Sequence, residues 1–223
     1  MAIDEQMQSP GADGPLERYR RWRRYRGSIQ TAALKHVSQS TLLEQARRIG
    51  MARGAALIVS SESEMSLLYD LAVYGAKEGR TRAIDRYASA QSTSSDPNEA
   101  LVLKALRESR FSWFRIIARQ PPFGVRIEDL LRGRELWLLE EGLERTMQPG
   151  SFLAARVAPI ECFVMTCGAI VPFDELMALD MHAFLANQEE RAILIRQADD
   201  RRFPERLYRT AIRRDLMGRV EYR

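Results

Sequence analysis

The chain has 223 residues, of which 45% are hydrophobic, and a formal net charge of +4. This length and composition are sufficient to bury a core, in one domain or in two small ones. No stretch approaches the roughly 20 apolar residues of a membrane-spanning helix, and the first thirty residues lack the apolar core of a signal peptide. We therefore expect a globular cytoplasmic protein with no membrane partner.

Positive charge is concentrated near the two ends of the chain. Residues 16–26 contain six arginines and one glutamate, and residues 201–223 contain eight arginines and three acids, so each region has a net charge of +5. The intervening part is acidic. This distribution is typical of interaction arms and not of a uniformly solvated surface.

The first half of the chain reads as a disordered lead-in, residues 1–15, followed by a helical region, residues 16–110. Glycine and proline, which favour turns and disordered segments, are frequent in the lead-in. Helix start and stop signals divide the region that follows: a Thr41–Glu44 capping box closed by Gly50, a Ser61–Glu64 pair, a separate short helix over residues 82–87, and an Asp96 cap followed by Pro97.

Strand-like alternation occupies residues 111–172, where turn formers separate five short apolar segments. The expected strands cover residues 111–119, 125–128, 135–139, 152–158 and 162–170. So many short strands within about sixty residues favour a small β-barrel-like module over a layered sandwich. The nearly continuous apolar run at 135–139 predicts a strand that is covered on both faces.

C-terminal helices are expected over residues 173–223. Asp174 can cap a long helix that runs to about Gln197, and Pro204 can open the last helix. In that last helix Leu207, Ala211 and Ile212 form an apolar side. Three arginines spaced at i, i+3 and i+7 share a different side and should point outward: Arg206, Arg209 and Arg213. The predicted fold class is α+β.

Short motifs in the strand-rich block resemble those of a group of uncharacterised bacterial proteins. These motifs are Asp129-Leu130-Leu131 with Gly133, Pro149-Gly150, Ala155-Arg156-Val157, and Gly168 with Pro172. The resemblance covers most of the chain beyond Leu16. It implies no activity.

The arginine-rich segment over residues 18–26 also contains aromatic residues. Guanidinium groups bind phosphates bidentately and flat rings stack on unpaired bases, so this composition suits nucleic acid. The alternative is that Tyr19 and Trp22 pack on the core while the arginines are solvated or pair with the acidic middle of the chain. The predicted nucleic-acid-binding residues are Arg18, Arg20, Arg21, Trp22, Arg23, Arg24, Arg26, Arg206, Arg209 and Arg213.

Residues 42–61 partly fit a helix-turn-helix, because Ala46 and Gly50 fall where that motif needs small residues. The second helix would contain Gly54 followed by Ala-Ala-Leu-Ile-Val. That segment is too apolar to read bases and resembles a strand, so we predict ordinary helical packing here.

No motif predicts a catalytic, metal or cofactor site. The two histidines, His36 and His182, have no acid or cysteine at metal-ligand spacing beside them. The chain has no Gly-x-Ser-x-Gly elbow and no phosphate-cradling glycine loop. Cys162 and Cys167 are five residues apart in one predicted strand, so we expect free structural thiols on opposite faces.

These observations favour non-enzymatic binding, with RNA or DNA as the ligand. The alternative is a protein-interaction or homo-oligomeric scaffold that uses its apolar helical stripes, with arginines serving solubility. An enzyme of unfamiliar design is the third reading. Its candidate residues are the acids Asp129, Glu140, Glu141 and Asp174, which could meet in space as an acid-base pair, although carboxylates usually face solvent.

Overall fold

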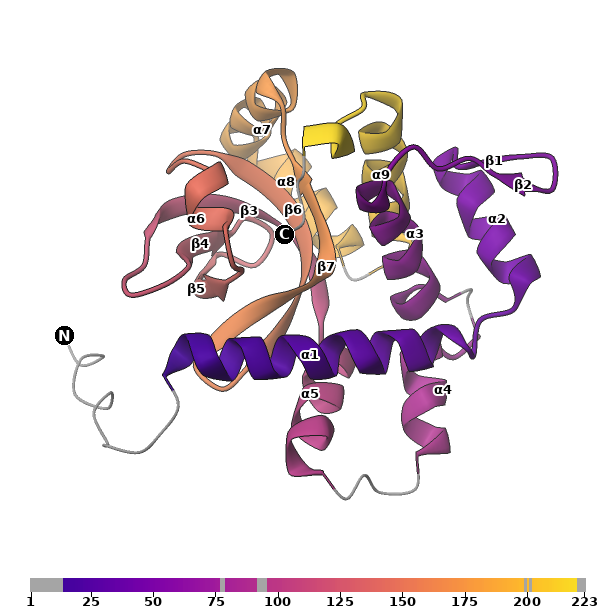
Figure 1. The fold of residues 1–223 in the computed structure, drawn as a ribbon. Helices are drawn as coiled ribbons and strands as arrows, with labels where there is room; N and C mark the ends of the chain where they lie inside the picture. Colours follow the sequence, from indigo (N-terminus) through magenta and orange to yellow (C-terminus); the bar gives the residue numbers. More distant parts are fainter. Residues whose placement is uncertain (1–13, 77–78, 92–95, 199, 201, 220–223) are drawn as a thin grey trace.

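The computed structural model describes residues 14–76, 79–91, 96–198, 200 and 202–219. A closed barrel of five strands lies on one side of the molecule, helices cover its other side, and the long helix α1 runs across one end (Figure 1). The fold is α+β, as the sequence predicts. The expected lead-in falls almost entirely on residues 1–13, which lie outside the described residues.

The described helices are numbered along the chain. Their bounds are α1 Pro15–Leu34, α2 Gln39–Ile49, α3 Glu62–Tyr74, α4 Ala83–Ala90, α5 Pro97–Arg107, α6 Leu143–Thr146, α7 Glu175–Ala186, α8 Gln188–Gln197, α9 Phe203–Arg213 and the short 3₁₀ helix η1 Met217–Arg219.

The barrel strands are β3 Arg110–Arg119, β4 Val125–Asp129, β5 Arg134–Leu139, β6 Phe152–Ile160 and β7 Phe163–Pro172. Strand β3 pairs antiparallel with both β4 and β6, and β6 forms a hairpin with β7. The barrel closes where β5 pairs in parallel with β7. Side chains alternate between the two faces of each strand, and the inward ones fill the closed barrel. Phe114, Leu153 and Val157 all lie in this buried interior.

Strand β5 differs from the expectation of a strand covered on both faces. Arg134 and Glu135 are exposed, and only Leu138 and Leu139 are buried. Pairing with β7 involves just those two last residues. The first half of β5, which begins with Arg134 and Glu135, therefore pairs with β4 alone.

Strands β6 and β7 are buried on both sides because helices cover the outside of the barrel. One group of outward side chains packs with α1, α4 and α5, where Trp22 lies 5.4 Å from the ring of Phe163. A second group packs with α2, α3 and α9 around Tyr208. The N-terminal and C-terminal helices thus share one core.

Most predicted helix starts are confirmed. Ser61, Asp96 and Asp174 each accept a backbone hydrogen bond from the first turn of α3, α5 and α7. The Thr41 prediction is wrong: α2 begins earlier, and Ser38 is its cap, accepting from the Thr41 amide at 3.2 Å. Gly50 closes α2 with a φ of 88°, a left-handed conformation that glycine adopts without strain.

Two further segments differ from their predictions. The long helix expected from Asp174 to Gln197 is interrupted at Asn187, whose extended backbone separates α7 from α8. Cys162 precedes β7 and lies in the tight turn after Ile160, so it is not in a strand. The segment after Gly50 forms a small hairpin, β1 Ala52–Arg53 with β2 Ala56–Leu57, which confirms that no recognition helix follows α2.

Candidate nucleic-acid interface

Helix α9 docks through one apolar side. Leu207, Tyr208 and Ala211 are buried there against α2 and α3. The Tyr208 hydroxyl donates to Asp70 Oδ2 at 2.9 Å. Burial raises the pKa of Tyr208 well above its ordinary value of 10.0, so this hydroxyl remains a donor.

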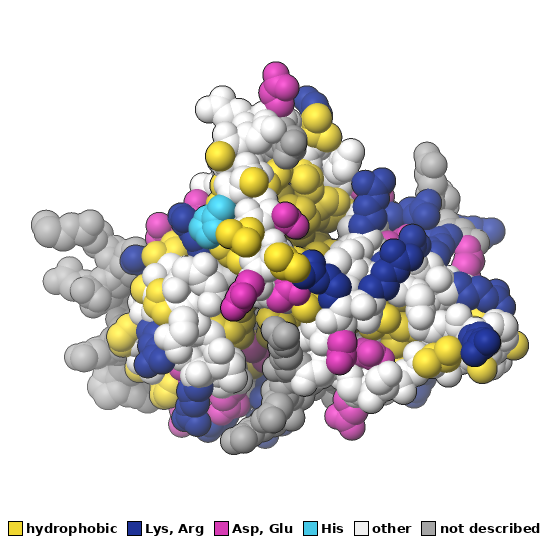
Figure 2. Space-filling view, turned by 90° about the horizontal axis from the view of Figure 1, so that it is seen from above, with side chains coloured by type: hydrophobic (Ala, Val, Ile, Leu, Met, Phe, Trp, Pro, Cys, Tyr) yellow, Lys and Arg dark blue, Asp and Glu magenta, His cyan; other side chains and the backbone are white. Residues whose placement is uncertain are grey.

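The opposite side of α9 is a stripe of arginines. Arg206, Arg209 and Arg213 are exposed, as predicted, and Arg202 just before the helix is exposed as well. Their spacing of i, i+4, i+7 and i+11 aligns the four side chains along one side of a helix. We call these four residues the α9 stripe. Basic atoms gather on the part of the surface where α9, α2 and the β1–β2 hairpin lie (Figure 2).

Two arginines of the α9 stripe also form contacts with other residues of the chain. Arg209 Nε donates to the carbonyl oxygen of Arg48 at 2.6 Å, at the C-terminal end of α2. Arg202 lies 3.4 Å from Glu205, which also pairs with Arg48 at 3.0 Å. In the described part of the chain, Arg206 and Arg213 have no ion-pair partner.

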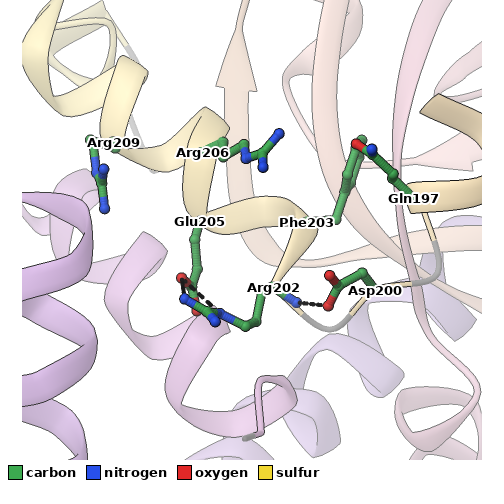
Figure 3. A pocket seen from close by; sticks show the side chains of 7 residues that line it. All are labelled: Gln197, Asp200, Arg202, Phe203, Glu205, Arg206 and Arg209. Carbon is green, nitrogen blue, oxygen red and sulfur yellow. Dashed lines mark hydrogen bonds and ion pairs between the residues drawn. The ribbon is translucent and has the colours of Figure 1, made fainter. Parts of the chain in front are cut away.

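A polar cavity of about 430 Å³ lies beside the α9 stripe. Figure 3 shows Arg202, Arg206 and Arg209 around it, with Arg202 joined to Glu205 and to Asp200. Phe203 and Gln197 form the other side of the cavity. The stripe therefore borders a hollow that is open to solvent.

The N-terminal arginine segment lies on α1, where its aromatic residues face inward. Tyr19 and Trp22 are 1% and 2% exposed. Arg26 is on the same buried side, and its Nη1 donates to the Thr166 carbonyl at 2.5 Å and lies 3.7 Å from Glu140. These three side chains pack on the barrel.

Several other arginines of α1 pair with carboxylates of the barrel. Arg18 lies 2.6 Å from Glu161, and both Arg20 and Arg23 pair with Glu141. The hydrogen bond from Arg20 lowers the pKa of the Glu141 carboxyl. Arg24 is exposed, Arg21 is half-buried, and both contribute to the outward side of the helix.

The structure does not bring the two predicted arginine sets together. Helix α1 packs on α3, α4 and α5, whereas α9 packs on α2 and α3. The α9 stripe includes Arg202, which belongs to the basic C-terminal region but was not predicted individually, because it precedes Pro204, the expected start of the helix. The i−4 spacing from Arg206 is the signal that could have found it.

A buried ionic cluster connects the sheet to the helices and was not anticipated. Arg156 of β6 donates to Asp70 of α3 from Nε at 2.8 Å and from Nη2 at 3.3 Å. Its guanidinium carbon lies 4.8 Å from the centre of the Tyr74 ring. Burial disfavours the charged form of Arg156, but the charge of Asp70 outweighs that effect and raises its pKa.

The remaining acids and thiols show structural roles in the described residues. Asp129 accepts from Ser112, Glu140 from Tyr19, and Asp174 pairs with Arg214. Burial raises the pKa of the Cys167 thiol to about 11, and Cys162 is a free, exposed thiol. No group of three histidine, cysteine or acidic side chains with metal-binding geometry occurs among the described residues.

None of the helices in the described ranges combines the length and the apolar character that crossing a membrane requires. No curated protein matches the chain significantly. No solved structure matches it either. A model of a family of unknown function, DUF7986, matches residues 14–202, a span that includes α1, the whole barrel, α7 and α8. Because this match covers well over half of the chain, the chain belongs to that family.

Proposed function

We propose that the protein binds nucleic acid through the phosphate backbone and that the α9 stripe is its contact surface. The observation that carries this proposal is the alignment of four exposed arginines on a helix whose other side is firmly docked. Guanidinium groups bind phosphate oxygens bidentately, so such a row suits a polyanion.

The geometry of the stripe supports binding of a polymer. Arg202 and Arg213 are eleven residues apart, which corresponds to about 16 Å along a helix. Double-stranded DNA carries one charge per about 1.7 Å of its axis, so the stripe spans several phosphates. Such contacts position a protein on nucleic acid without reading its sequence. We therefore propose binding that is independent of sequence and sensitive to salt.

The α1 segment has a smaller part in this proposal. Arg18, Arg23 and Arg26 are engaged by Glu161, Glu141 and the barrel, and the Trp22 ring is buried. Arg24 is exposed, and Arg20 is exposed as well although it also pairs with Glu141. They form a second, weaker contact in the proposed complex.

The test is fluorescence anisotropy of a labelled oligonucleotide over a series of salt concentrations. The double variant Arg206→Gln/Arg213→Gln should bind more weakly, and the slope of log affinity against log salt should fall by about two, one for each lost phosphate contact. Arg20→Gln/Arg24→Gln should have a smaller effect. The matched control, Arg119→Gln/Arg145→Gln, removes the same charge from exposed positions in the barrel module.

The proposal fails if the wild-type protein shows no binding at about 50 mM salt, where screening is weak. It also fails if the control variant loses as much affinity as the α9 variant, because net charge and not the stripe would then be responsible.

A protein-contact role is the second candidate, and one observation favours it. Leu176 and Leu179 of α7 are 62% and 64% exposed, on a helix whose other side covers the barrel. One version of this role is self-association, and light scattering across a series of protein concentrations tests for it. A monomer at every concentration would eliminate self-association, and a dimer that Leu176→Ser/Leu179→Ser dissociates would support it.

A further inference from the structure

Another cavity, of about 370 Å³, lies where Ala198, Asp200 and Pro204 approach α3, α5 and the barrel. Among the described residues, five arginines line it: Arg82, Arg107, Arg110, Arg132 and Arg156. Glu108 and Asp200 are the acidic side chains that line it in the described residues. We call this space the arginine pocket, and cationic groups outnumber anionic groups on its walls.

Arg82 and Arg107 are both held by the carboxylate of Asp85, which lies outside the pocket. Asp85 accepts from Arg82 Nε at 2.6 Å and from Arg107 Nε at 3.1 Å, and Asp85 itself does not line the pocket. Burial opposes ionisation of Asp85, but the hydrogen bonds from Arg82 and Arg107 outweigh it and lower the pKa of this carboxyl. The two guanidinium groups are thus oriented before any ligand arrives.

Arg156 is fixed in the same way in the pocket wall. Asp70 engages its Nε and Nη2, and Tyr74 stacks beneath its guanidinium group. The guanidinium edge that carries Nη1 is not used by Asp70. This arginine is buried, so its charge acts in an environment where electrostatic attraction is screened less than at the surface.

We propose that the arginine pocket binds a phosphate group, carried either by a small molecule or by the end of a nucleic-acid chain. Arginine binds oxyanions bidentately, and donors approach this pocket from several elements around it. A tetrahedral phosphate accepts hydrogen bonds in several directions, whereas a planar carboxylate accepts them near one plane. The volume lies toward the small end of ligand pockets, about 300–1,000 Å³, which suits a compact ligand.

The pocket and the α9 stripe share no arginine, so the two proposals stand or fall separately. The first measurement is isothermal titration calorimetry of the full chain with inorganic phosphate, at constant ionic strength set by potassium chloride. Saturable binding is expected. The same titration with potassium chloride alone should give no saturable heat.

One variant tests the site. Arg107→Gln should weaken phosphate binding about tenfold, because a hydrogen bond to a charged group is lost. The Arg107 side chain is 50% exposed, so folding should tolerate the change. The control is Arg145→Gln, an arginine with an 85% exposed side chain that does not line the pocket.

Two further titrations distinguish a phosphate group on a small molecule from one at the end of a nucleic-acid chain. Tighter binding of adenosine 5′-monophosphate than of inorganic phosphate assigns the pocket to a small molecule. Competition by a 5′-phosphorylated oligonucleotide, but not by the same oligonucleotide without that phosphate, assigns it to a chain end. The proposal is overturned if wild-type protein shows no saturable phosphate binding, or if Arg107→Gln binds phosphate as the wild type does.

Discussion

Arg24 and Arg26 are two residues apart in the same arginine-rich segment, yet their environments differ completely. Arg24 is exposed, whereas Arg26 is 8% exposed and bonded to the barrel. The difference follows from helical periodicity, because Arg26 falls on the stripe that also contains Tyr19, Trp22 and Ile29. Composition alone assigned all six arginines to one ligand, but position on the helix separates those that stabilise the fold from those that face solvent.

The two cysteines show the same dependence on position. Cys162 lies in the β6–β7 turn and is exposed, and Cys167 lies within β7 and is 4% exposed. The contrast in exposure that the sequence analysis expected is present. Its cause differs from the prediction. Cys162 lies in a turn and Cys167 lies inside a strand, whereas the prediction placed them on two faces of one strand.

We expect only Cys162 to react with a thiol reagent in the folded protein. Because the pKa of Cys167 is about 11, about one Cys167 thiol in a thousand is ionised at pH 8. Mass spectrometry after labelling at pH 8 should show one modification per chain, and a second one only in urea. Rapid double labelling without denaturant would mean that β7 opens readily, contrary to its buried position.

Helix α9 has two chemically different sides. Its apolar side completes the core that contains Ile49, Leu68 and Phe111, which come from α2, α3 and β3. Its arginine side faces solvent. Stability and ligand binding should therefore respond to different substitutions in the same helix.

We expect Leu207→Ala to lower the free energy of unfolding by about 2–5 kcal/mol, because it leaves a cavity in a packed core. Arg206→Gln/Arg213→Gln should stay within about 0.5 kcal/mol of the wild type, as surface substitutions usually do. Arg209→Gln should cost about 1 kcal/mol, since it removes the hydrogen bond to Arg48. Urea denaturation of the three variants measures these differences. An Arg206/Arg213 variant less stable than Leu207→Ala would show that the stripe holds the fold together.

Hydrogen bonds to two carboxylates connect α1 to the barrel and to the start of α5. Arg20 of α1 hydrogen-bonds Glu141 after β5, and Tyr25 of α1 hydrogen-bonds Asp96 before α5. These bonds lower the pKa values of the Glu141 and Asp96 carboxyls. Folding therefore favours the ionised carboxyls, and the folded state binds fewer protons than the unfolded state at mildly acidic pH.

The stabilisation from these carboxyls should be complete at neutral pH and disappear in acid. The ordinary pKa values of Glu141 and Asp96 are 4.5 and 3.8, so stability should begin to fall as the pH drops through this range and continue until both carboxyls are protonated in the folded state. Urea denaturation at pH 7, 4.5 and 3 measures the loss.

The matched variant for this acid response is Glu141→Gln. It should be less stable than the wild type at pH 7. The gap should narrow at pH 3, which lies below the ordinary pKa of 4.5, because the unfolded chain is then protonated at Glu141 and the ionised carboxylate contributes less to stability. A gap that stays constant between pH 7 and pH 3 would show that the charge of Glu141 is not what stabilises the fold.

Local sequence patterns determined much of this protein. The alternation that places Phe114 and Leu153 on one face, the caps at Ser61, Asp96 and Asp174, and the two-sided character of α9 all depend on neighbours close in the chain. Side-chain periodicity and capping are short-range effects, so they can be read without the tertiary structure. The five-stranded barrel and the α+β class followed from them.

Only the tertiary structure decided which charges remain available and which cavities form. Glu141 pairs with arginines of α1 from more than a hundred residues away, and the arginine pocket brings together Arg82, Arg132 and Arg156 from three separate parts of the chain. The shared core of α2, α3 and α9 likewise joins the two ends of the chain. Such contacts depend on how the elements pack, because the energy of a charge is set by its burial and its partners and not by its place in the sequence.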